Sequence, residues 1–403
     1  MKVLLLTFYF PPDLSAGSFR AQALVQALLD QLPDHSSLDV VTTLPNRYAS
    51  FSTTAVEYEE NANLTIHRIP LPSHKSGMLD QSLAFLCYAR RVLKKTRRES
   101  YDIVVATSSR LMTAVLGAWV AKRCRAKLYL DIRDIFIENL PFLLPRGSQW
   151  LGMRFFGALE RWAVRRAAIV NLASPGFEGY FAPRYPSQCF TWHTNGVDPV
   201  FADWAAGSFP KNPSIDAEES SSFSPVEKGR LRILYAGNIG MGQGLDRILP
   251  GLAKRLEDRA DFIVIGDGGR RALLEKVLKE KGVRNVEVRS PVKRDRLLEE
   301  YHASDVLFLH LNDMPCFERV IPSKIFEYAA TGKPIWAGVC SFTARFFQKN
   351  ITNIAVFESC NVDSALEEFG RLSLEACSRN EFVMDYRRDV IMKRMASDIV
   401  GML

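Results

Sequence analysis

Short apolar runs alternate with longer amphipathic stretches along most of this chain. The first run, 2–10, is apolar at nearly every position, which is typical of a central strand in a parallel sheet. It ends at Pro11 and Pro12, and a loop of small residues, 13–18, leads to a predicted helix over 19–32. A strand, a glycine-containing loop and a helix in this order form the beginning of a βαβ unit.

The same alternation continues through both halves of the chain. Further strands of the first half are predicted at 38–42, 64–69, 102–107, 127–132, 168–173 and 189–193. Those of the second half are predicted at 231–236, 261–265, 285–290 and 305–311. Helical segments separate most of them, so the pattern predicts the α/β class with doubly wound parallel sheets. A segment rich in Ser, Pro and charge, 205–230, predicts a linker between two domains.

The strongest candidate for ligand chemistry lies within 316–335. Pro322 and Ser323 precede a helical run, and Ser323 can cap it. Free amides at the helix start and the cation of Lys324 would form an anion site, while Glu327 lies one turn further on the same face. A cation for phosphate and a carboxylate for sugar hydroxyls suit a nucleoside diphosphate. An ordinary helix with a solvated Lys–Glu pair is the alternative.

Glycine-containing loops follow several of the predicted strands. Gly17 lies in the first of them and would let the backbone approach a ligand, although a plain turn between strand and helix is the alternative. Two more loops, one with Gly237 and Asn238 and one with Gly266, follow strands of the second half. Neither has the GxGxxG spacing of dinucleotide-binding folds, but their amides could approach a phosphate or a nucleoside.

Charged residues also follow the predicted strand 127–132. Arg133 and Asp134 come directly after it, where parallel sheets bind their ligands. We therefore expect them to contact an acceptor or to orient a phosphate. A plain Arg–Asp pair at the surface is the alternative.

The basic excess of the chain lies entirely in its first half. Residues 1–200 contain 23 Lys and Arg against 16 Asp and Glu, whereas the remainder has 29 of each. This half should favour an anionic partner, such as an acidic membrane surface. One segment, from Gly77 to Arg98, predicts a basic amphipathic helix that could lie on a bilayer or could pack its apolar face on the sheet. Nucleic-acid binding is disfavoured because the basic residues lack a recognition motif.

The aromatic residues, the cysteines and the longest apolar stretch bear on burial, metal binding and location in the cell. Aromatic residues and arginines alternate in 140–167, and we expect a buried helix face there rather than an interfacial belt. The seven cysteines form no CxxC and no His-paired metal spacing, so no metal site is expected. With no secretory signal at the start, reduced cytoplasmic thiols are favoured. The longest near-apolar stretch, 111–121, is too short for a membrane span.

Several short motifs in this order make the chain resemble the family 4 retaining glycosyltransferases of the GT-B fold. They are Tyr9-Phe10-Pro11-Pro12 with Gly17, Asn195-Gly196-Val197-Asp198, Tyr235-Ala236-Gly237-Asn238, Ile265-Gly266-Asp267-Gly268, and Pro322-Ser323-Lys324-Ile325-Phe326-Glu327-Tyr328. The resemblance is to the branch that builds O-antigen and capsule sugars, including N-acetyl-fucosaminyl transferases.

This resemblance implies two facing Rossmann-like domains with a nucleotide sugar in the cleft. An acceptor-binding domain is expected over 1–200, a linker or mobile loop over 201–230, a nucleotide-sugar domain over 231–385, and a last helix, 386–403, that packs back on the first domain. Glu327 would hold the ribose hydroxyls, and Gly17 would lie near the diphosphate. The backbone of Val292 would contact the base, and Asp134 would face the acceptor and the sugar.

The chain departs from the family pattern at several of these positions. Arg319, with Glu318 beside it, stands where the family has its first motif glutamate. The usual cations that clamp the diphosphate align with the uncharged Asn238 and Gln243, and the usual histidine aligns with Arg133. Because the leaving phosphates still need stabilising, we expect Lys324 and Arg319 to do so with amides at the helix start.

The function these features imply is transfer of a sugar from a UDP-type donor to a glycan hydroxyl with retention at the anomeric carbon. The acceptor is expected to be polyprenyl-diphosphate-linked, at the cytoplasmic face of the cell membrane, and no metal or other cofactor is expected. A nucleotide-sugar epimerase of similar fold is the nearest alternative. A non-catalytic nucleotide-sugar-binding protein is another, because the first motif glutamate is missing.

Overall fold

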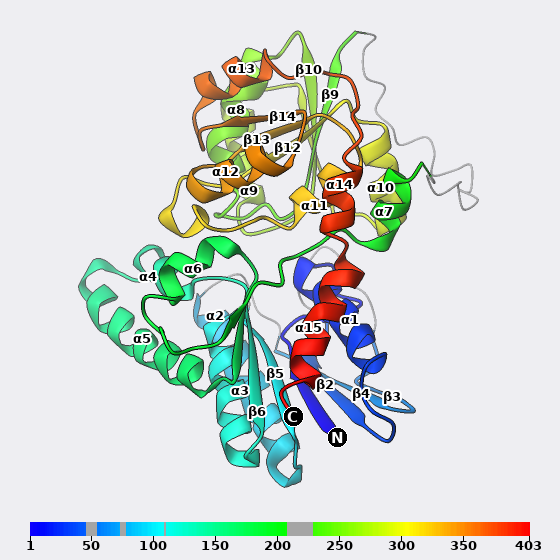
Figure 1. The fold of residues 1–403 in the computed structure, drawn as a ribbon. Coiled ribbons are helices and arrows are strands. Elements are labelled where there is room, and N and C mark those ends of the chain that lie inside the picture. Colours follow the sequence, from blue (N-terminus) through cyan, green and yellow to red (C-terminus); the bar gives the residue numbers. More distant parts are fainter. Residues whose placement is uncertain (46–54, 73–77, 109, 208–228) are drawn as a thin grey trace. The chain divides into compact units, whose positions relative to one another are not determined.

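The computed structural model describes residues 1–45, 55–72, 78–108, 110–207 and 229–403. It divides into two compact units, and each is built around one β-sheet with helices on both faces (Figure 1). The first unit comprises Met1–Asn195 and Arg388–Leu403, and the second comprises Gly196–Arg387. The doubly wound α/β architecture that the alternation predicts is confirmed.

The sheet of the first unit has the strand order β3-β4-β2-β1-β5-β6-β7-β8. Its strands are β1 (Lys2–Leu6), β2 (Ser37–Thr43), β3 (Tyr58–Asn61), β4 (Leu64–Ile69), β5 (Ile103–Ser108), β6 (Lys127–Ile132), β7 (Ile169–Leu172) and β8 (Phe190–Thr191). All neighbours are parallel except β3, which pairs antiparallel with β4. This edge strand was not predicted because its sequence, YEEN, has no apolar alternation.

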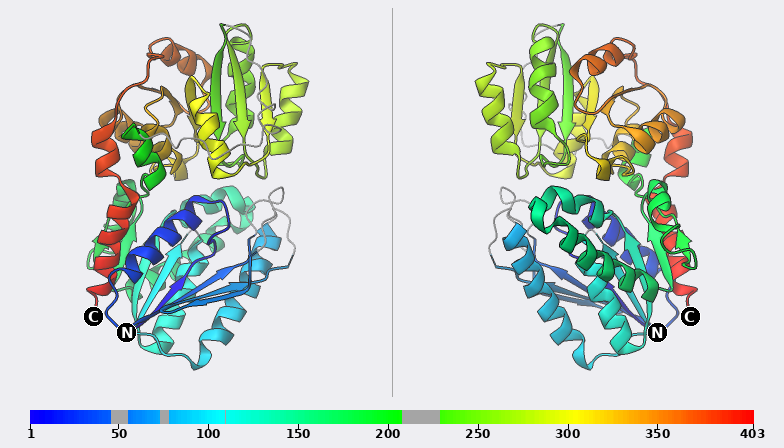
Figure 2. Two further views of the ribbon diagram at one scale, coloured as in Figure 1. Left: turned by 90° about the vertical axis from the view of Figure 1, so that its right-hand side faces the viewer. Right: turned by 90° about the vertical axis from the view of Figure 1, so that its left-hand side faces the viewer.

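Helices cover both faces of this sheet. They are α1 (Ala16–Leu29), α2 (Met78–Lys95), α3 (Leu111–Cys124), α4 (Phe136–Leu143), α5 (Gln149–Arg166), α6 (Glu178–Phe181) and α15 (Arg388–Val400). From β1 the chain moves to β2, toward the edge of the sheet that ends in β3. From β4 it moves through β5 and β6 to β7, toward the edge that ends in β8. Right-handed crossovers therefore place α1 on one face, where α15 packs beside it, and α2, α3 and α5 on the other (Figure 2).

The first strand and the first helix differ in extent from their predictions. β1 ends at Leu6. Phe8 and Phe10 are buried as well, but they lie in the loop that follows the strand, where the Phe8 ring stacks on Phe85. α1 begins at Ala16 rather than at residue 19. The Ser15 side chain caps it by accepting a hydrogen bond from the Ser18 amide at 3.1 Å.

The sheet of the second unit has the strand order β11-β10-β9-β12-β13-β14, and all of its strands are parallel. The strands are β9 (Leu231–Ala236), β10 (Ala260–Ile265), β11 (Val286–Arg289), β12 (Val306–His310), β13 (Ile335–Gly338) and β14 (Ile354–Phe357). The order reverses between β9 and β12, so their carboxyl ends form a topological switch point, where such sheets bind ligands.

The helices of this unit bury both faces of the sheet. They are α7 (Pro199–Ala205), α8 (Leu245–Arg255), α9 (Arg271–Glu280), α10 (Arg294–His302), α11 (Lys324–Ala330), α12 (Ser341–Asn350), α13 (Val362–Phe369) and α14 (Asn380–Asp385). Along β9, Ile233 enters one apolar cluster and Leu234 the other, which explains why the strand is apolar at successive positions. α7 packs in this unit, while most of the predicted linker, 208–228, lies outside the described residues.

Two helical segments of the first unit bury only part of their apolar side chains. Gly77 lies outside the described residues, but the rest of the basic segment forms α2 and a short 3-10 turn, Thr96–Arg98. Phe85, Tyr88 and Val92 of α2 are buried, so much of its apolar face packs inside the unit. In 140–167 the predicted buried face is wrong for Trp150 and Phe155, which are exposed on α5.

Candidate functional site

The amino end of α11 holds three hydrogen-bonded side chains close to the switch point of the second sheet. Lys324 Nζ donates to Glu327 Oε2 at 2.7 Å and to the Tyr301 hydroxyl at 2.9 Å. That hydroxyl in turn donates to Glu327 Oε2 at 3.0 Å. The structure thus brings Lys324 and Glu327 together, as their spacing predicts, and adds Tyr301 of α10, which the sequence analysis missed.

This arrangement leaves the ammonium group able to bind an anion. Lys324 has three N–H donors, and two of them are used by Glu327 and Tyr301. Its side chain is 28% exposed, whereas that of Glu327 is 11% exposed. Burial, followed by the charge of Glu327, raises the pKa of Tyr301 well above its usual value, so this hydroxyl keeps its proton and orients both partners.

The residues before α11 are held differently from the prediction. Ser323 has helical backbone angles and its side chain makes no capping hydrogen bond, so the expected cap is wrong. The loop with Glu318 and Arg319 is fixed from α12, because the Thr343 hydroxyl donates to the Val320 carbonyl at 2.8 Å. Ser341 Oγ donates to the Glu318 carboxylate at 3.1 Å, so this carboxylate faces α12.

The two glycine-rich loops of the second unit pack against each other. A Cβ on Gly266 would lie 1.8 Å from the Gly237 carbonyl oxygen, and one on Gly268 would lie 2.5 Å from the Ile239 carbonyl oxygen. These glycines therefore have a structural reason to lack side chains, whatever ligand their amides meet. The side chain of Val292, after β11, packs on the core of the unit.

Asn238 and Gln243, which stand where the family usually has its two cations, are hydrogen-bonded to each other. Asn238 Nδ2 donates to Gln243 Oε1 at 2.7 Å, and the Gly240 amide donates to the same oxygen at 3.2 Å. This amide pair fixes the loop after β9. It adds no positive charge, so any charge needed there must come from elsewhere.

A buried histidine that sequence reasoning missed joins this loop to the rest of the unit. His310 Nδ1 lies 2.6 Å from the Gln243 carbonyl, and Nε2 accepts from the Cys360 amide at 2.9 Å. Burial lowers the pKa of His310 to about 4, so the ring is neutral and donates from Nδ1. A lone histidine at the end of an apolar strand gives no sequence signal for this role.

The first unit brings Gly17 and Arg133 together at the carboxyl ends of β1 and β6. A Cβ on Gly17 would lie 2.5 Å from an Arg133 terminal nitrogen, so the guanidinium group packs directly against the amino end of α1. Burial lowers the pKa of Arg133 to about 10, which still leaves it charged at neutral pH. A partly buried cation beside a helix amino end can bind an anion.

Asp134 follows Arg133 and is also half-buried. Burial raises the pKa of Asp134 to about 6, although a hydrogen bond from Asn139 opposes the shift. The carboxyl group can therefore exchange a proton near neutral pH, which an acceptor-facing group could use.

A second arginine of this region has a structural role that the sequence did not reveal. Arg20, on α1, donates to Asp131 Oδ2 at 2.9 Å from Nε and to Asp131 Oδ1 at 2.8 Å from a terminal nitrogen. It also donates to the Thr194 carbonyl at 2.6 Å, and both partners of the ion pair are buried. This ion pair fixes α1 against β6, two residues before Arg133.

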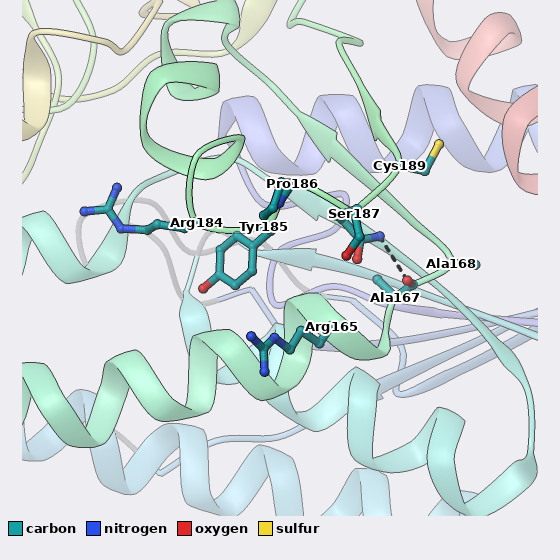
Figure 3. A pocket seen from close by; sticks show the side chains of 9 residues that line it. Arg165, Ala167, Ala168, Arg184, Tyr185, Pro186, Ser187 and Cys189 are labelled. Carbon is teal, nitrogen blue, oxygen red and sulfur yellow. Dashed lines mark hydrogen bonds between the residues drawn. The ribbon is translucent and has the colours of Figure 1, made fainter.

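Other features lie away from these groups. A cavity of about 430 Å³ lies at the amino ends of β7 and β8, the opposite edge of the sheet from Gly17 (Figure 3). Arg165, Arg184 and Cys189 are among its lining residues. In the part of the chain that the structure describes, no three His, Cys, Asp or Glu residues are grouped as metal ligands. No described helix is long and apolar enough to cross a membrane.

Solved structures with this architecture include several glycosyltransferases. WaaG, a glycosyltransferase involved in lipopolysaccharide biosynthesis, is 15% identical with a TM-score of 0.66 over 99% of this chain and 100% of its own. Anabaena Alr3699/HepE in complex with UDP and glucose is 15% identical with a TM-score of 0.64 over the whole of both chains. At these identities the likeness shows the fold, which is GT-B.

One sequence relative has a specific name. WcaI of Escherichia coli (strain K12), which is named as a glycosyl transferase of colanic acid biosynthesis, is 31% identical over 100 residues. The match covers 25% of this chain and 24% of that relative.

Two family models cover most of the sequence. The Glycosyl transferase 4-like domain matches residues 21–187, and the Glycosyl transferases group 1 domain matches residues 216–386. The first lies in the unit of Gly17 and Arg133, and the second contains Lys324 and Glu327. With both domains in this order on a GT-B fold, the chain belongs to the glycosyltransferases that combine a 4-like domain with a group 1 domain.

Proposed function

We propose that this protein is a retaining glycosyltransferase that moves a sugar from a nucleoside-diphosphate donor, UDP, to a glycan acceptor. The observation that supports it most is the partly exposed Lys324 ammonium, which Glu327 and Tyr301 hold with one donor left for a phosphate. HepE, a structure of the same fold, was solved with UDP and glucose. Transfer of a hexosyl or N-acetylhexosaminyl group is the proposed chemistry.

The reaction is proposed to proceed on one face of the donor sugar. The bond between the anomeric carbon and the phosphate oxygen breaks, and its electron pair stays with the diphosphate. The acceptor hydroxyl oxygen bonds to the anomeric carbon, and its proton passes to the departing phosphate oxygen. Lys324, with Arg319, stabilises the charge that develops on the diphosphate, so the proposal requires no metal ion.

The remaining site residues are proposed to position the two substrates. Glu327 accepts hydrogen bonds from the ribose, and the Val292 backbone contacts the base. The loops with Gly237, Asn238 and Gly266 and the turn at Ser323 line the donor.

In the first unit, Gly17 and Arg133 bind a phosphate and Asp134 faces the acceptor hydroxyl. This assignment is supported by the half-buried guanidinium group of Arg133 beside the amino end of α1 and by the raised pKa of Asp134.

The proposed acceptor is a growing cell-surface polysaccharide, of the O-antigen or capsule kind, carried on polyprenyl diphosphate. The names of WcaI and WaaG, which refer to colanic acid and lipopolysaccharide biosynthesis, support this choice. Such an acceptor would place the protein peripherally at the inner face of the cell membrane. The basic excess of residues 1–200 suits that anionic surface.

Lys324→Ala provides the test of this function. Release of UDP from a panel of UDP-sugars, with membrane extract as acceptor, should fall about 100-fold in kcat because a group that stabilises the leaving phosphate is lost. Lys349→Ala, an exposed lysine on α12, is the matched control and should leave kcat unchanged. An unchanged kcat for a folded Lys324→Ala would remove this residue from the mechanism.

The same assay separates the two rival functions. An epimerase would convert the UDP-sugar when no acceptor is present. A non-catalytic binding protein would bind UDP and release none of it from a UDP-sugar with any acceptor. Transfer of labelled sugar to a lipid-extractable product supports the glycosyltransferase.

A further inference from the structure

The α5 helix presents large apolar side chains to solvent. Trp150 is 69% exposed, Leu151 66% and Phe155 59%, and Phe142 at the end of α4 is 47% exposed. Gln149 Nε2 donates to the Pro141 carbonyl at 2.8 Å, so the end of α4 lies against the start of α5. A contiguous exposed group of this kind is unusual on a protein surface that has no partner.

The spacing of these residues places them on one side of the helix together with arginines. Trp150 and Arg154 are four residues apart, and the Arg154 guanidinium lies 4.9 Å from the centre of the Trp150 ring. Leu151 and Phe155 form a second pair with the same spacing, and Arg161 continues this exposed side. Aromatic residues and cations therefore alternate along the solvent face of α5.

No negative charge accompanies them on this helix. The acidic residue of α5, Glu160, points into the unit, where it accepts hydrogen bonds from Tyr185 at 2.9 Å and Tyr180 at 3.2 Å. Ala163 and Val164 are buried with it. The exposed side of α5 is thus apolar and basic over its whole length.

The same character continues onto the neighbouring helix. Trp119 of α3 is 55% exposed, and its ring lies 6.5 Å from that of Trp162 on α5. Lys122 and Arg123 at the end of α3 are exposed, and Arg123 donates to Thr96 Oγ1 at 2.8 Å, next to the basic end of α2. One face of the first unit therefore carries much of the positive excess of the chain.

We propose that the solvent face of α5, with Phe142 of α4 and Trp119 of α3, is a docking surface for an anionic lipid bilayer. Tryptophan and phenylalanine enter the interfacial layer, while the arginine stems lie along it and their guanidinium groups meet lipid phosphates. A second copy of this chain fits poorly, because two such faces would bring arginine against arginine. The inference goes beyond glycosyl transfer and does not depend on it.

This surface differs from the one that the sequence favours. The amphipathic α2 has more basic residues, but its Phe85, Tyr88 and Val92 are buried in the unit, which leaves Leu83 and Leu86 exposed. α2 can add electrostatic attraction. The apolar insertion is assigned to α5, where more than half of the surface of Trp150 and of Phe155 is exposed.

The test is co-sedimentation of the full chain with phosphatidylcholine vesicles, with and without phosphatidylglycerol. The wild type should bind the anionic vesicles. The double variant Trp150→Ser/Phe155→Ser should bind them at least about tenfold more weakly, because two large apolar side chains no longer leave water. Arg154→Gln/Arg161→Gln should reduce the preference for phosphatidylglycerol.

Leu83→Ser/Leu86→Ser on α2 is the matched control and should bind as the wild type does. All of these side chains are exposed, so thermal unfolding should be unchanged and turnover with a water-soluble acceptor should persist. Loss of binding in the α2 variant alone would overturn the proposal. So would a vesicle-independent dimer that the Trp150→Ser/Phe155→Ser variant abolishes, or binding to RNA but not to vesicles.

Discussion

At the scale of single residues, the most informative group is the hydroxyl of Tyr301. It accepts from Lys324 and donates to Glu327, so it fixes the angle at which the ammonium group presents its remaining donor. Its ring packs between Phe201 and Tyr328 and does not depend on the hydroxyl. The role of this residue can therefore be separated from the packing of the core.

We expect Tyr301→Phe to lower kcat/KM for the donor about tenfold or more, since a hydrogen bond to a charged group is worth roughly 1.5–3 kcal/mol. The melting temperature should change little because the ring remains. Tyr101→Phe, which removes a buried hydroxyl that donates to Asp39 at 2.8 Å in the first unit, is the control and should leave kcat/KM unchanged. Equal kinetics for Tyr301→Phe and wild type would show that Lys324 is positioned without it.

Asp134 gives a prediction about pH. Burial raises its pKa to about 6, so the carboxyl group is mostly ionised at pH 7.5 and mostly protonated at pH 5. If the carboxylate faces the acceptor hydroxyl, kcat/KM should decrease about tenfold per pH unit below 6. Asp134→Asn should lower activity and remove this acid limb, and a limb that persists in the variant would assign it to another group.

Sequence reasoning at this scale found residues with a motif and missed those without one. Lys324 and Glu327 have helical spacing, and Gly17 lies in a predicted loop. Tyr301 follows two glutamates on a mostly polar helix, and His310 ends an apolar strand. Neither pattern shows that the polar group will be buried with a partner. The prediction that Ser323 caps the helix is wrong because this residue has helical backbone angles, so the turn extends toward Pro322.

At the scale of helices and strands, α1 is held by an ion pair rather than by apolar packing alone. Arg20 joins it to Asp131 of β6, and Asn171 of β7 donates to the same carboxylate at 2.7 Å. Burial is the largest single influence and would raise the pKa of Asp131, but the charge and hydrogen bonds of Arg20, together with Arg133 and Asn171, hold it below its usual value. The position of Gly17 and Arg133 depends on this contact.

Arg20→Met should therefore destabilise the first unit by about 3–5 kcal/mol, because the Asp131 charge would be left buried without its cation. Urea unfolding followed by circular dichroism measures the loss. Adding Asp131→Asn should recover part of it, since the uncompensated charge is then removed. A cost below about 1 kcal/mol for Arg20→Met would mean that water reaches the site, contrary to the burial seen here.

The strands were easier to predict than the helix surfaces. Both faces of β9 and β12 are buried, so these strands are apolar throughout and stand out in the sequence. β13 and β14 were missed, although β7 and β11, which are equally short, were predicted. On α5 the aromatic spacing was taken as a sign of burial, whereas spacing alone does not show which face of a helix meets the core.

At the scale of the whole molecule, the chain returns to its first unit at the end. The two ends of the second unit are joined by a hydrogen bond, which the Val197 amide donates to the Tyr386 carbonyl at 2.7 Å. The chain then continues into α15, which packs beside α1. Met392, Met395 and Ile399 of α15 are fully buried there. The family resemblance predicted a last helix over 386–403 that packs back on the first domain. The residues alone did not indicate this partner, because an apolar stripe does not identify the surface that covers it.

This return makes the stability of the first unit depend on residues almost 400 positions from its first strand. Met392→Ala should destabilise the first unit by about 2–5 kcal/mol, as other buried methionine truncations do. Hydrogen exchange in α1 should become faster, while the strands of the second unit keep their protection. Lys393→Ala changes the exposed neighbour on the same helix and should alter neither. Equal loss of protection in both units would show that they unfold as one body, and that α15 stabilises the whole protein rather than the unit it packs on.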